Sequence, residues 1–205
     1  MDRVKKIAVD FDDVLVCTFP ILLPLLNNWF GRTFKLSDVR AYNLSELFGV
    51  DGADIADAYC EFDKRGVFSK LPVFYGAVKG LKALRKRGWE TYVVTSRPEY
   101  MREQTQKYLD RYFDGLIREL YLAEHPSDLK SGDRLSKAEI VKNIGAGVLI
   151  DDCLQHILEA HQRGVLGLLF DYRRMYSWNK GNLPLEVKRV CSWEEIINQI
   201  PKGFI

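Results

Sequence analysis

The chain has 205 residues, of which 47% are hydrophobic, 12% aromatic and 28% charged. This composition excludes a disordered chain, a collagen-like fibre and a small scaffold that depends on disulfides. The net charge of +2 gives no indication of binding to a nucleic acid polymer or to an anionic membrane. The length predicts one domain, or one domain with a modest insert, that buries roughly 70% of its unfolded surface.

The cysteines and histidines show no pattern typical of a disulfide framework or a zinc site. The cysteines are widely spaced and form no Cys-x-x-Cys pair: Cys17, Cys60, Cys153 and Cys191. We therefore expect free, buried thiols, as in a reducing cytoplasm. The histidines do not stand at ligand spacing from a cysteine pair and are expected to be structural.

The N-terminal region contains an apolar stretch, residues 14–26, that superficially resembles a secretory signal. Aspartates precede it, Pro20 and Pro24 interrupt it, and it is too short to span a bilayer. These features predict a cytoplasmic protein without a membrane segment.

Strand and helix patterns alternate along most of the chain. Short apolar runs predict buried strands at residues 4–9, 90–95, 116–122, 147–150 and 165–170. Helical spacing and capping signals predict helices at residues 76–87, 98–112 and 152–163, and after the Ser-x-x-Glu pairs that begin at Ser136 and Ser192. This alternation predicts an α/β fold, a Rossmann-like doubly wound parallel sheet.

One segment interrupts the alternation directly after the first strand. Residues 19–30, 36–48 and 52–64 are predicted to form short helices and are rich in aromatic residues. The simplest interpretation is a small helical cap at residues 18–72, inserted into a core formed by residues 1–17 and 73–205.

Polar residues follow the strands of the predicted sheet, where open parallel sheets bind ligands. Carboxylates, hydroxyls and cations therefore share one rim: Asp10, Asp12 and Asp13 after the first strand, Thr95, Ser96 and Arg97 after the second, Lys137 before the fourth, and Asp151 and Asp152 after it. Aspartate is also common in turns, and Asp13 is expected to have such a structural role.

This set of residues is typical of phosphoryl transfer. Clustered carboxylates without histidine or cysteine point to Mg²⁺, while Lys137, Thr95 and Ser96 can bind phosphate oxygens. Asp10 and Asp12 are two residues apart and are expected on the same side of the strand end. One can attack phosphorus while the other handles the proton of the leaving group.

The segments VDFDDVLV and VVTSRP, Lys137 and the segment LIDD resemble, in this order, the four motifs of the haloacid dehalogenase superfamily. The resemblance implies the fold of that superfamily, with Asp10 as the nucleophile and Asp12 as the general acid and base. It also implies that Thr95 and Lys137 hold the phosphoryl group. Mg²⁺ would be bound by Asp10, the main-chain carbonyl of Asp12 and Asp151, with Asp152 supporting.

Residues 66–98, together with the ending CSWEEII, resemble the 5′(3′)-deoxyribonucleotidase family, whose helical cap lies between the first two motifs. By position, Phe68 matches an aromatic residue of that family's nucleotide pocket. The chain departs from the family at Asp13, where glycine is frequent, and at Arg97, which adds a cation beside the phosphate or an ion pair at a helix start. Residues 123–135 and 172–183 match nothing that we can place.

We therefore expect a Mg²⁺-dependent phosphomonoesterase that hydrolyses nucleoside monophosphates through an aspartyl-phosphate, as a monomer or homodimer. One alternative is a phosphatase for another small phosphomonoester, such as a sugar phosphate. An alternative of another class is a receiver-like or inactive phosphate-binding module. Receivers, however, place the acid pair and the phosphorylated aspartate on different strands and have no helical insert after the first.

Overall fold

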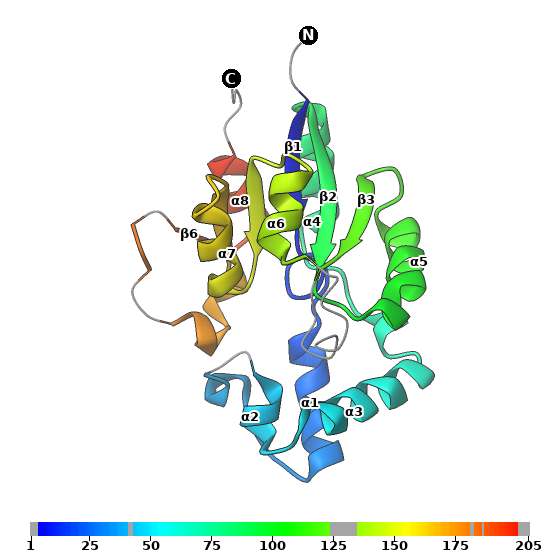
Figure 1. The fold of residues 1–205 in the computed structure, drawn as a ribbon. Coiled ribbons are helices and arrows are strands. Elements are labelled where there is room, and N and C mark those ends of the chain that lie inside the picture. Colours follow the sequence, from blue (N-terminus) through cyan, green and yellow to red (C-terminus); the bar gives the residue numbers. More distant parts are fainter. Residues whose placement is uncertain (1–3, 41–42, 124–134, 181–182, 186, 201–205) are drawn as a thin grey trace.

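The computed structural model describes residues 4–40, 43–123, 135–180, 183–185 and 187–200 (Figure 1). Its centre is a parallel sheet with the strand order β3-β2-β1-β4-β5-β6. The strands are β1 (Lys5–Val9), β2 (Trp89–Thr95), β3 (Ile117–Leu122), β4 (Val148–Asp151), β5 (Leu166–Phe170) and β6 (Lys188–Val190). The chain starts in the middle and winds outward in both directions, which confirms the doubly wound α/β fold. The strand order reverses between β1 and β4.

Alternate residues of each strand face opposite sides of the sheet, and both sides are buried. Ile7 and Val9 belong to one hydrophobic cluster, whereas Ala8 between them belongs to the other. The same division separates Val148 and Ile150 from Leu149 in β4. Burial on both faces explains why these strands are nearly continuous apolar runs.

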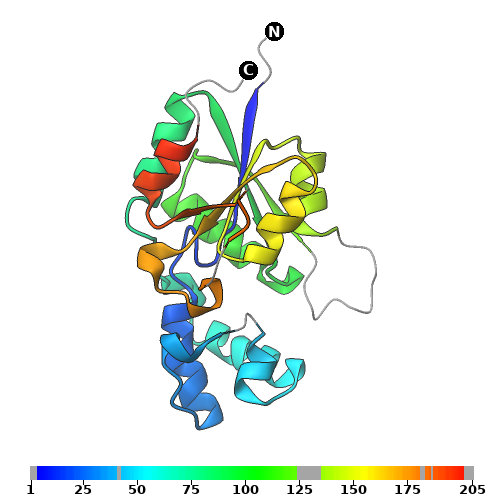
Figure 2. The ribbon, with the colours of Figure 1, turned by 90° about the vertical axis from the view of Figure 1, so that its left-hand side faces the viewer.

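Helices cover both faces of the sheet (Figure 2). The helices α4 (Ala77–Lys86), α5 (Arg102–Tyr112) and α8 (Trp193–Gln199) contribute to one cluster, and α6 (Lys137–Asn143) and α7 (Leu154–His161) to the other. Two glycines permit close packing between elements. A Cβ added at Gly80 would lie 2.5 Å from Trp193, and one at Gly167 would lie 2.4 Å from Ile157.

The segment between β1 and α4 is helical and lies at one end of the molecule, beyond the carboxyl ends of the strands (Figures 1 and 2). It contains α1 (Phe19–Phe30), η1 (Leu36–Asp38), α2 (Leu44–Phe48), α3 (Gly52–Lys64) and η2 (Phe68–Lys70). Leu22, Phe48 and Phe62 are buried in the same cluster as Ile7 of the sheet. The insert is therefore packed over the end of the sheet where a ligand is expected.

Several local expectations need correction. The sequence pattern did not indicate β6, an edge strand of three residues with two basic ones. The helix expected at residues 36–48 is two short pieces, η1 and α2, and the one expected at 98–112 begins as η3 (Glu99–Met101). At α8, Ser192 accepts a hydrogen bond from the Glu195 N–H, but the Glu195 carboxylate accepts from Cys191 rather than from Ser192.

All four cysteines lie among the described residues. All four cysteines are free, but only Cys153 is buried and Cys60 is exposed, because Cys60 lies on the outer side of α3. Among the described residues, none of the helices has the length and apolar character needed to span a bilayer.

Candidate active site

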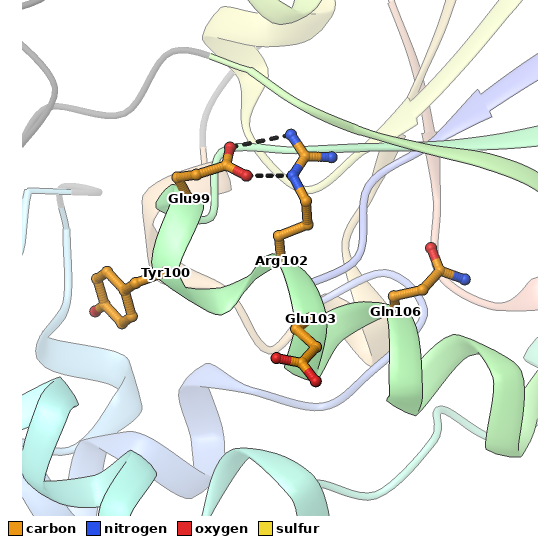
Figure 3. A pocket seen from close by; sticks show the side chains of 5 residues that line it. All are labelled: Glu99, Tyr100, Arg102, Glu103 and Gln106. Carbon is orange, nitrogen blue, oxygen red and sulfur yellow. Dashed lines mark hydrogen bonds and ion pairs between the residues drawn. The ribbon is translucent and has the colours of Figure 1, made fainter.

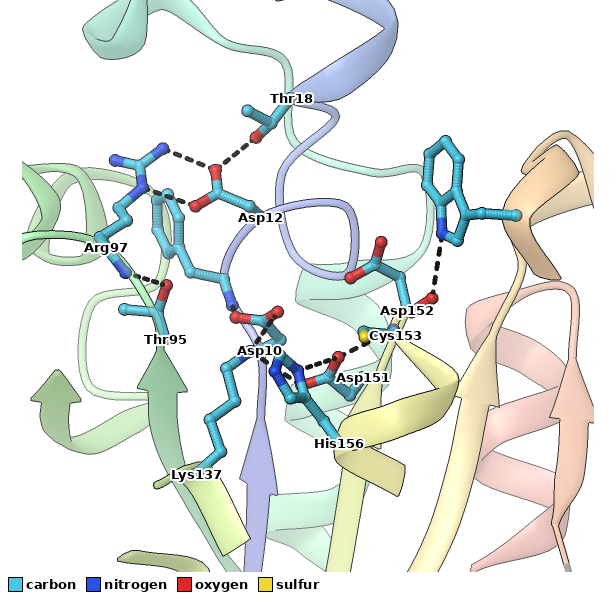
Figure 4. Close-up of polar contacts among 12 residues, drawn as sticks. Asp10, Asp12, Thr18, Thr95, Arg97, Lys137, Asp151, Asp152, Cys153 and His156 are labelled. Atoms are coloured by element: carbon cyan, nitrogen blue, oxygen red, sulfur yellow. Dashed lines mark hydrogen bonds and ion pairs between the residues drawn. The ribbon is translucent and has the colours of Figure 1, made fainter. Parts of the chain in front are cut away.

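Most of the predicted site residues converge at the carboxyl ends of β1, β2 and β4, as Figure 4 shows for Asp10, Asp12, Thr95, Arg97, Lys137, Asp151 and Asp152. Hydrogen bonding between β1 and β4 continues past the strand end, where the Asp10 N–H donates to Ile150 O at 2.9 Å. This bond places Asp10 beside Asp151. Lys137 joins them from the first turn of α6, whose start at Ser136 is fixed by the predicted capping box with Glu139.

Lys137 bridges two buried carboxylates. Its Nζ lies 2.6 Å from Asp10 Oδ2 and 2.8 Å from Asp151 Oδ2, and all three side chains are at most 3% exposed. Burial, together with the charge of Asp151, raises the pKa of Asp10 to about 7, although Lys137 opposes this shift. Burial also acts on Asp151, but Lys137 and His156 hold the pKa of that carboxyl well below its usual range.

Asp12 is held by a bidentate ion pair. Arg97 donates from Nε to Asp12 Oδ2 and from Nη2 to Asp12 Oδ1, both at 2.7 Å, and Thr18 Oγ1 donates to Oδ1 at 2.6 Å. Burial opposes ionisation, but the guanidinium holds the pKa of Asp12 below its usual value. The carboxylate keeps 21% of its side-chain surface exposed, more than the other carboxylates of this cluster.

Arg97 is enclosed by protein groups. Its guanidinium lies 4.4 Å from the ring centre of Phe11 and 5.4 Å from that of Phe68, and Nη1 donates to Thr105 Oγ1 at 3.2 Å. The guanidinium of Arg97 forms an ion pair with Asp12, and its expected place beside the phosphate stays a prediction.

Asp13 has a structural role, as expected. Its φ of 55° is left-handed, and its carboxylate accepts hydrogen bonds from the N–H groups of Thr18 and Phe19 at the start of α1. Tyr176 donates to the same carboxylate at 2.7 Å. Aspartate tolerates this conformation better than most residues, so the turn forms without the glycine that is frequent here.

Asp151 and Asp152 differ in what surrounds their carboxylates. Asp151 accepts hydrogen bonds from Lys137 and the Cys153 N–H, and it contacts His156 Nδ1 at 3.1 Å. Both carboxylate oxygens of Asp152 are buried and have no hydrogen-bond partner among the residues that the structure describes. Burial, with the nearby acids Asp13, Asp151 and Asp10, raises the pKa of Asp152 well above its usual value.

This arrangement fits a divalent cation. Carboxylate oxygens of Asp10, Asp151 and Asp152 all lie within 4.8 Å of one another. A buried carboxylate without a partner is costly unless a cation or a proton neutralises it. Oxygen donors without nitrogen or sulfur are the set that Mg²⁺ prefers.

The remaining predicted residues surround the aspartates. Thr95 is buried at the end of β2, and its Oγ1 accepts a hydrogen bond from the Arg97 N–H at 3.3 Å. Ser96 is half-buried beside it. Phe68 is 2% exposed, and its ring contacts Tyr59 at 5.6 Å between ring centres as well as Arg97.

A separate depression of about 530 Å³ lies along η3 and α5 (Figure 3). Exposed or half-exposed polar side chains line it, and none of the predicted site residues is among them: Glu99, Tyr100, Arg102, Glu103 and Gln106. We locate the site at the aspartates instead, because the buried carboxylate of Asp152, which has no partner among the described residues, lies there and not in the depression.

Comparison with known proteins agrees with this geometry. The family model described as "5' nucleotidase, deoxy (Pyrimidine), cytosolic type C protein" matches residues 3–203. The chain belongs to this family. It is also 24% identical over 210 residues to a Bacillus cereus protein named "Putative nucleotidase", covering 96% of this chain and 98% of that one.

Solved structures with a similar fold are haloacid dehalogenase-type hydrolases and phosphatases. A predicted phosphatase from Clostridium acetobutylicum has a TM-score of 0.67 at 14% identity, over 96% of this chain and 97% of that one. A family hydrolase from Deinococcus radiodurans, with bound phosphate and sodium, has a TM-score of 0.57 at 17% identity, over 94% and 93%. These likenesses show that the chain has the haloacid dehalogenase fold. Its membership of the 5' nucleotidase family makes it a phosphatase.

Sequence reasoning missed several residues that contact the site of this nucleotidase-family protein. His156 was expected to be structural, yet it contacts Asp151 from the first turn of α7, a position that its distance from the LIDD motif could have indicated. Asp12 accepts a hydrogen bond from Thr18, and Asp13 accepts one from Tyr176. The main-chain oxygen of Asp152 accepts one from Asn179. No local pattern marks these three residues. Of the histidines expected to be structural, His125 lies outside the described residues.

Proposed function

We propose that the protein is a Mg²⁺-dependent phosphomonoesterase that hydrolyses nucleoside monophosphates through an aspartyl-phosphate on Asp10. The observation that carries this proposal is the cluster of Asp10, Asp151 and Asp152 with Lys137 at the switch point of the sheet. The family description supports a nucleotide substrate, and its wording supports a cytosolic location.

Asp10, Asp152 and the main-chain carbonyl of Asp12 would hold the metal ion. We assign Asp152 a direct role and Asp151 the supporting one, because the oxygens of Asp151 are already engaged by Lys137 and the Cys153 N–H. When bound, Mg²⁺ would keep the carboxylates ionised and neutralise the charge of the phosphoryl group. Asp151 then serves to orient Lys137.

The proposed reaction has two steps, in which Asp10 is the nucleophile and Asp12 transfers the protons. An Asp10 oxygen attacks phosphorus, and the bond to the leaving oxygen breaks. Asp12, whose pKa the Arg97 ion pair lowers in this structure, has to be protonated in the substrate complex to donate a proton to that oxygen. Asp12 next removes a proton from water, which attacks the aspartyl-phosphate, and phosphate leaves as Asp10 is restored. Lys137 offsets the negative charge during both steps, with Thr95 and Ser96 positioned to donate to phosphate oxygens.

The position of the helical insert supports a reaction that takes place in a site closed off from solvent. We propose that residues 18–72 form a cap over the core of residues 1–17 and 73–205. Asp10, Asp152 and Lys137 are at most 3% exposed, and we propose that the cap moves to admit the substrate. Phe68 and Arg97 lie on facing sides of this boundary, and we propose that they border the nucleoside once the cap has moved.

Phosphate release tests the function. The panel contains ribo- and deoxyribonucleoside monophosphates, sugar phosphates and an aryl phosphate, each with Mg²⁺ and with a chelator. We expect Mg²⁺-dependent turnover concentrated on nucleotides, loss of turnover in Asp10→Asn, and wild-type turnover in Asp114→Asn, which changes an exposed aspartate. Turnover confined to sugar phosphates would remove the nucleotide assignment. Turnover by a folded Asp10→Asn protein would refute the mechanism.

A further inference from the structure

The connection between β5 and β6 contacts two of the aspartate-bearing loops. It contains η5 (Tyr172–Arg174) and η6 (Ser177–Asn179). The hydroxyl of Tyr176 donates to Asp13 Oδ1 at 2.7 Å, and Asn179 Nδ2 donates to the main-chain oxygen of Asp152 at 2.6 Å. One segment therefore joins the loop after β1 to the loop after β4.

This segment is itself held in place. Asp171 Oδ1 accepts a hydrogen bond from the Tyr176 N–H at 3.1 Å, and Arg189 donates both to the Asp171 carboxylate and to the main-chain oxygen of Asn179. Tyr176 and Asn179 are 0% and 2% exposed. Their donors cannot turn toward solvent, so they keep a defined direction.

Asp152 depends on its main chain for its orientation. Its carboxylate has no hydrogen-bond partner among the described residues, unlike that of Asp151. Its main-chain oxygen, in contrast, accepts hydrogen bonds from Asn179 Nδ2 and, at 3.4 Å, from Trp178 Nε1. Outer partners of this kind commonly orient metal ligands, and their loss typically costs about 10- to 100-fold in affinity.

We propose that Asn179 is a positioning residue of the metal site. By holding the peptide group of Asp152, it directs the unpartnered carboxylate toward Asp10, with which Asp152 shares the acidic cluster. This inference rests on the proposed Mg²⁺ dependence. Asn179 lies in a segment of the chain that the four motifs do not cover.

Calorimetric titration of Mg²⁺ tests the inference on the full chain. Asn179→Asp retains the side-chain shape but replaces the donor by an acceptor, and Asn179→Ala removes it. Ser177→Ala is the matched control, because Ser177 lies in the same segment and its buried hydroxyl has no partner among the described residues. We expect both Asn179 variants to bind Mg²⁺ at least about tenfold more weakly than wild type and Ser177→Ala to bind normally.

Steady-state kinetics provide a second readout that a purely structural role would not move. In the Asn179 variants the Mg²⁺ concentration for half-maximal activity should rise about tenfold or more, while the substrate KM at saturating Mg²⁺ stays unchanged. Wild-type Mg²⁺ affinity in folded variants would overturn the inference. So would unfolding of both Asn179 variants while Ser177→Ala folds, which would assign Asn179 to stability alone. If wild type itself binds no Mg²⁺, the proposed function fails instead.

Discussion

Lys137→Met removes the cation whose Nζ lies 2.6 Å from Asp10 Oδ2 and 2.8 Å from Asp151 Oδ2. Methionine has a similar length and suits a buried position, so the variant changes charge more than volume. In the absence of a metal ion, the variant leaves both carboxylates without the cation that lies between them.

The expected cost follows from this burial. Removing one partner of a buried ion pair destabilises a protein by about 3–5 kcal/mol. Burial already raises the pKa of Asp10 to about 7, so this carboxyl can take up a proton and lower the penalty. We therefore expect a destabilisation at the lower end of this range, about 3 kcal/mol. For a chain of this size, that loss lowers Tm by roughly 6–12 °C.

Thermal unfolding in a chelator, at a pH of about 7, measures the effect. Lys142→Met, an exposed lysine on the same helix, is the control and should leave Tm within about 1–2 °C of wild type. Adding Asp151→Asn to Lys137→Met should cost less than the sum of the two single changes, because one buried charge is removed with its partner. A Tm unchanged by Lys137→Met would refute this account of the buried charges.

The other predictions concern the second ion pair, the core and pH. Arg97→Lys should lower kcat about 10- to 100-fold, because an ammonium cannot make the bidentate pair; an unchanged kcat would contradict this role. Gly80→Ala should cost about 1–2 kcal/mol in denaturant unfolding, because its Cβ would lie 2.5 Å from Trp193, whereas Gly52→Ala, with nothing within 4 Å, should not destabilise. Because burial raises the pKa of Asp10 to about 7, a proton competes with Mg²⁺ below that pH, so stabilisation by Mg²⁺ should grow from about pH 6 to about pH 8. A stabilisation independent of pH would contradict the last prediction.

The sequence by itself determined the sheet, its helical layers and the location of the acidic rim. Strands buried on both faces need continuous apolar runs, and the run Ile7-Ala8-Val9 contributes side chains to both hydrophobic clusters. Parallel strands end at a common edge, so residues that follow β1, β2 and β4 must meet there. These are regular consequences of local periodicity. The sequence pattern did not predict β6, because an edge strand of three residues has almost no periodicity.

Only the tertiary structure decided how the polar groups of the rim pair. Asp151 and Asp152 are neighbours with the same local signal. The carboxylate of Asp151 accepts a hydrogen bond from Lys137, whereas that of Asp152 has no partner among the described residues. Likewise, Arg97 pairs with Asp12 from 85 positions away. Such contacts depend on how elements that are far apart in the sequence pack together, and on the direction in which each buried donor then points. A one-dimensional pattern contains neither kind of information.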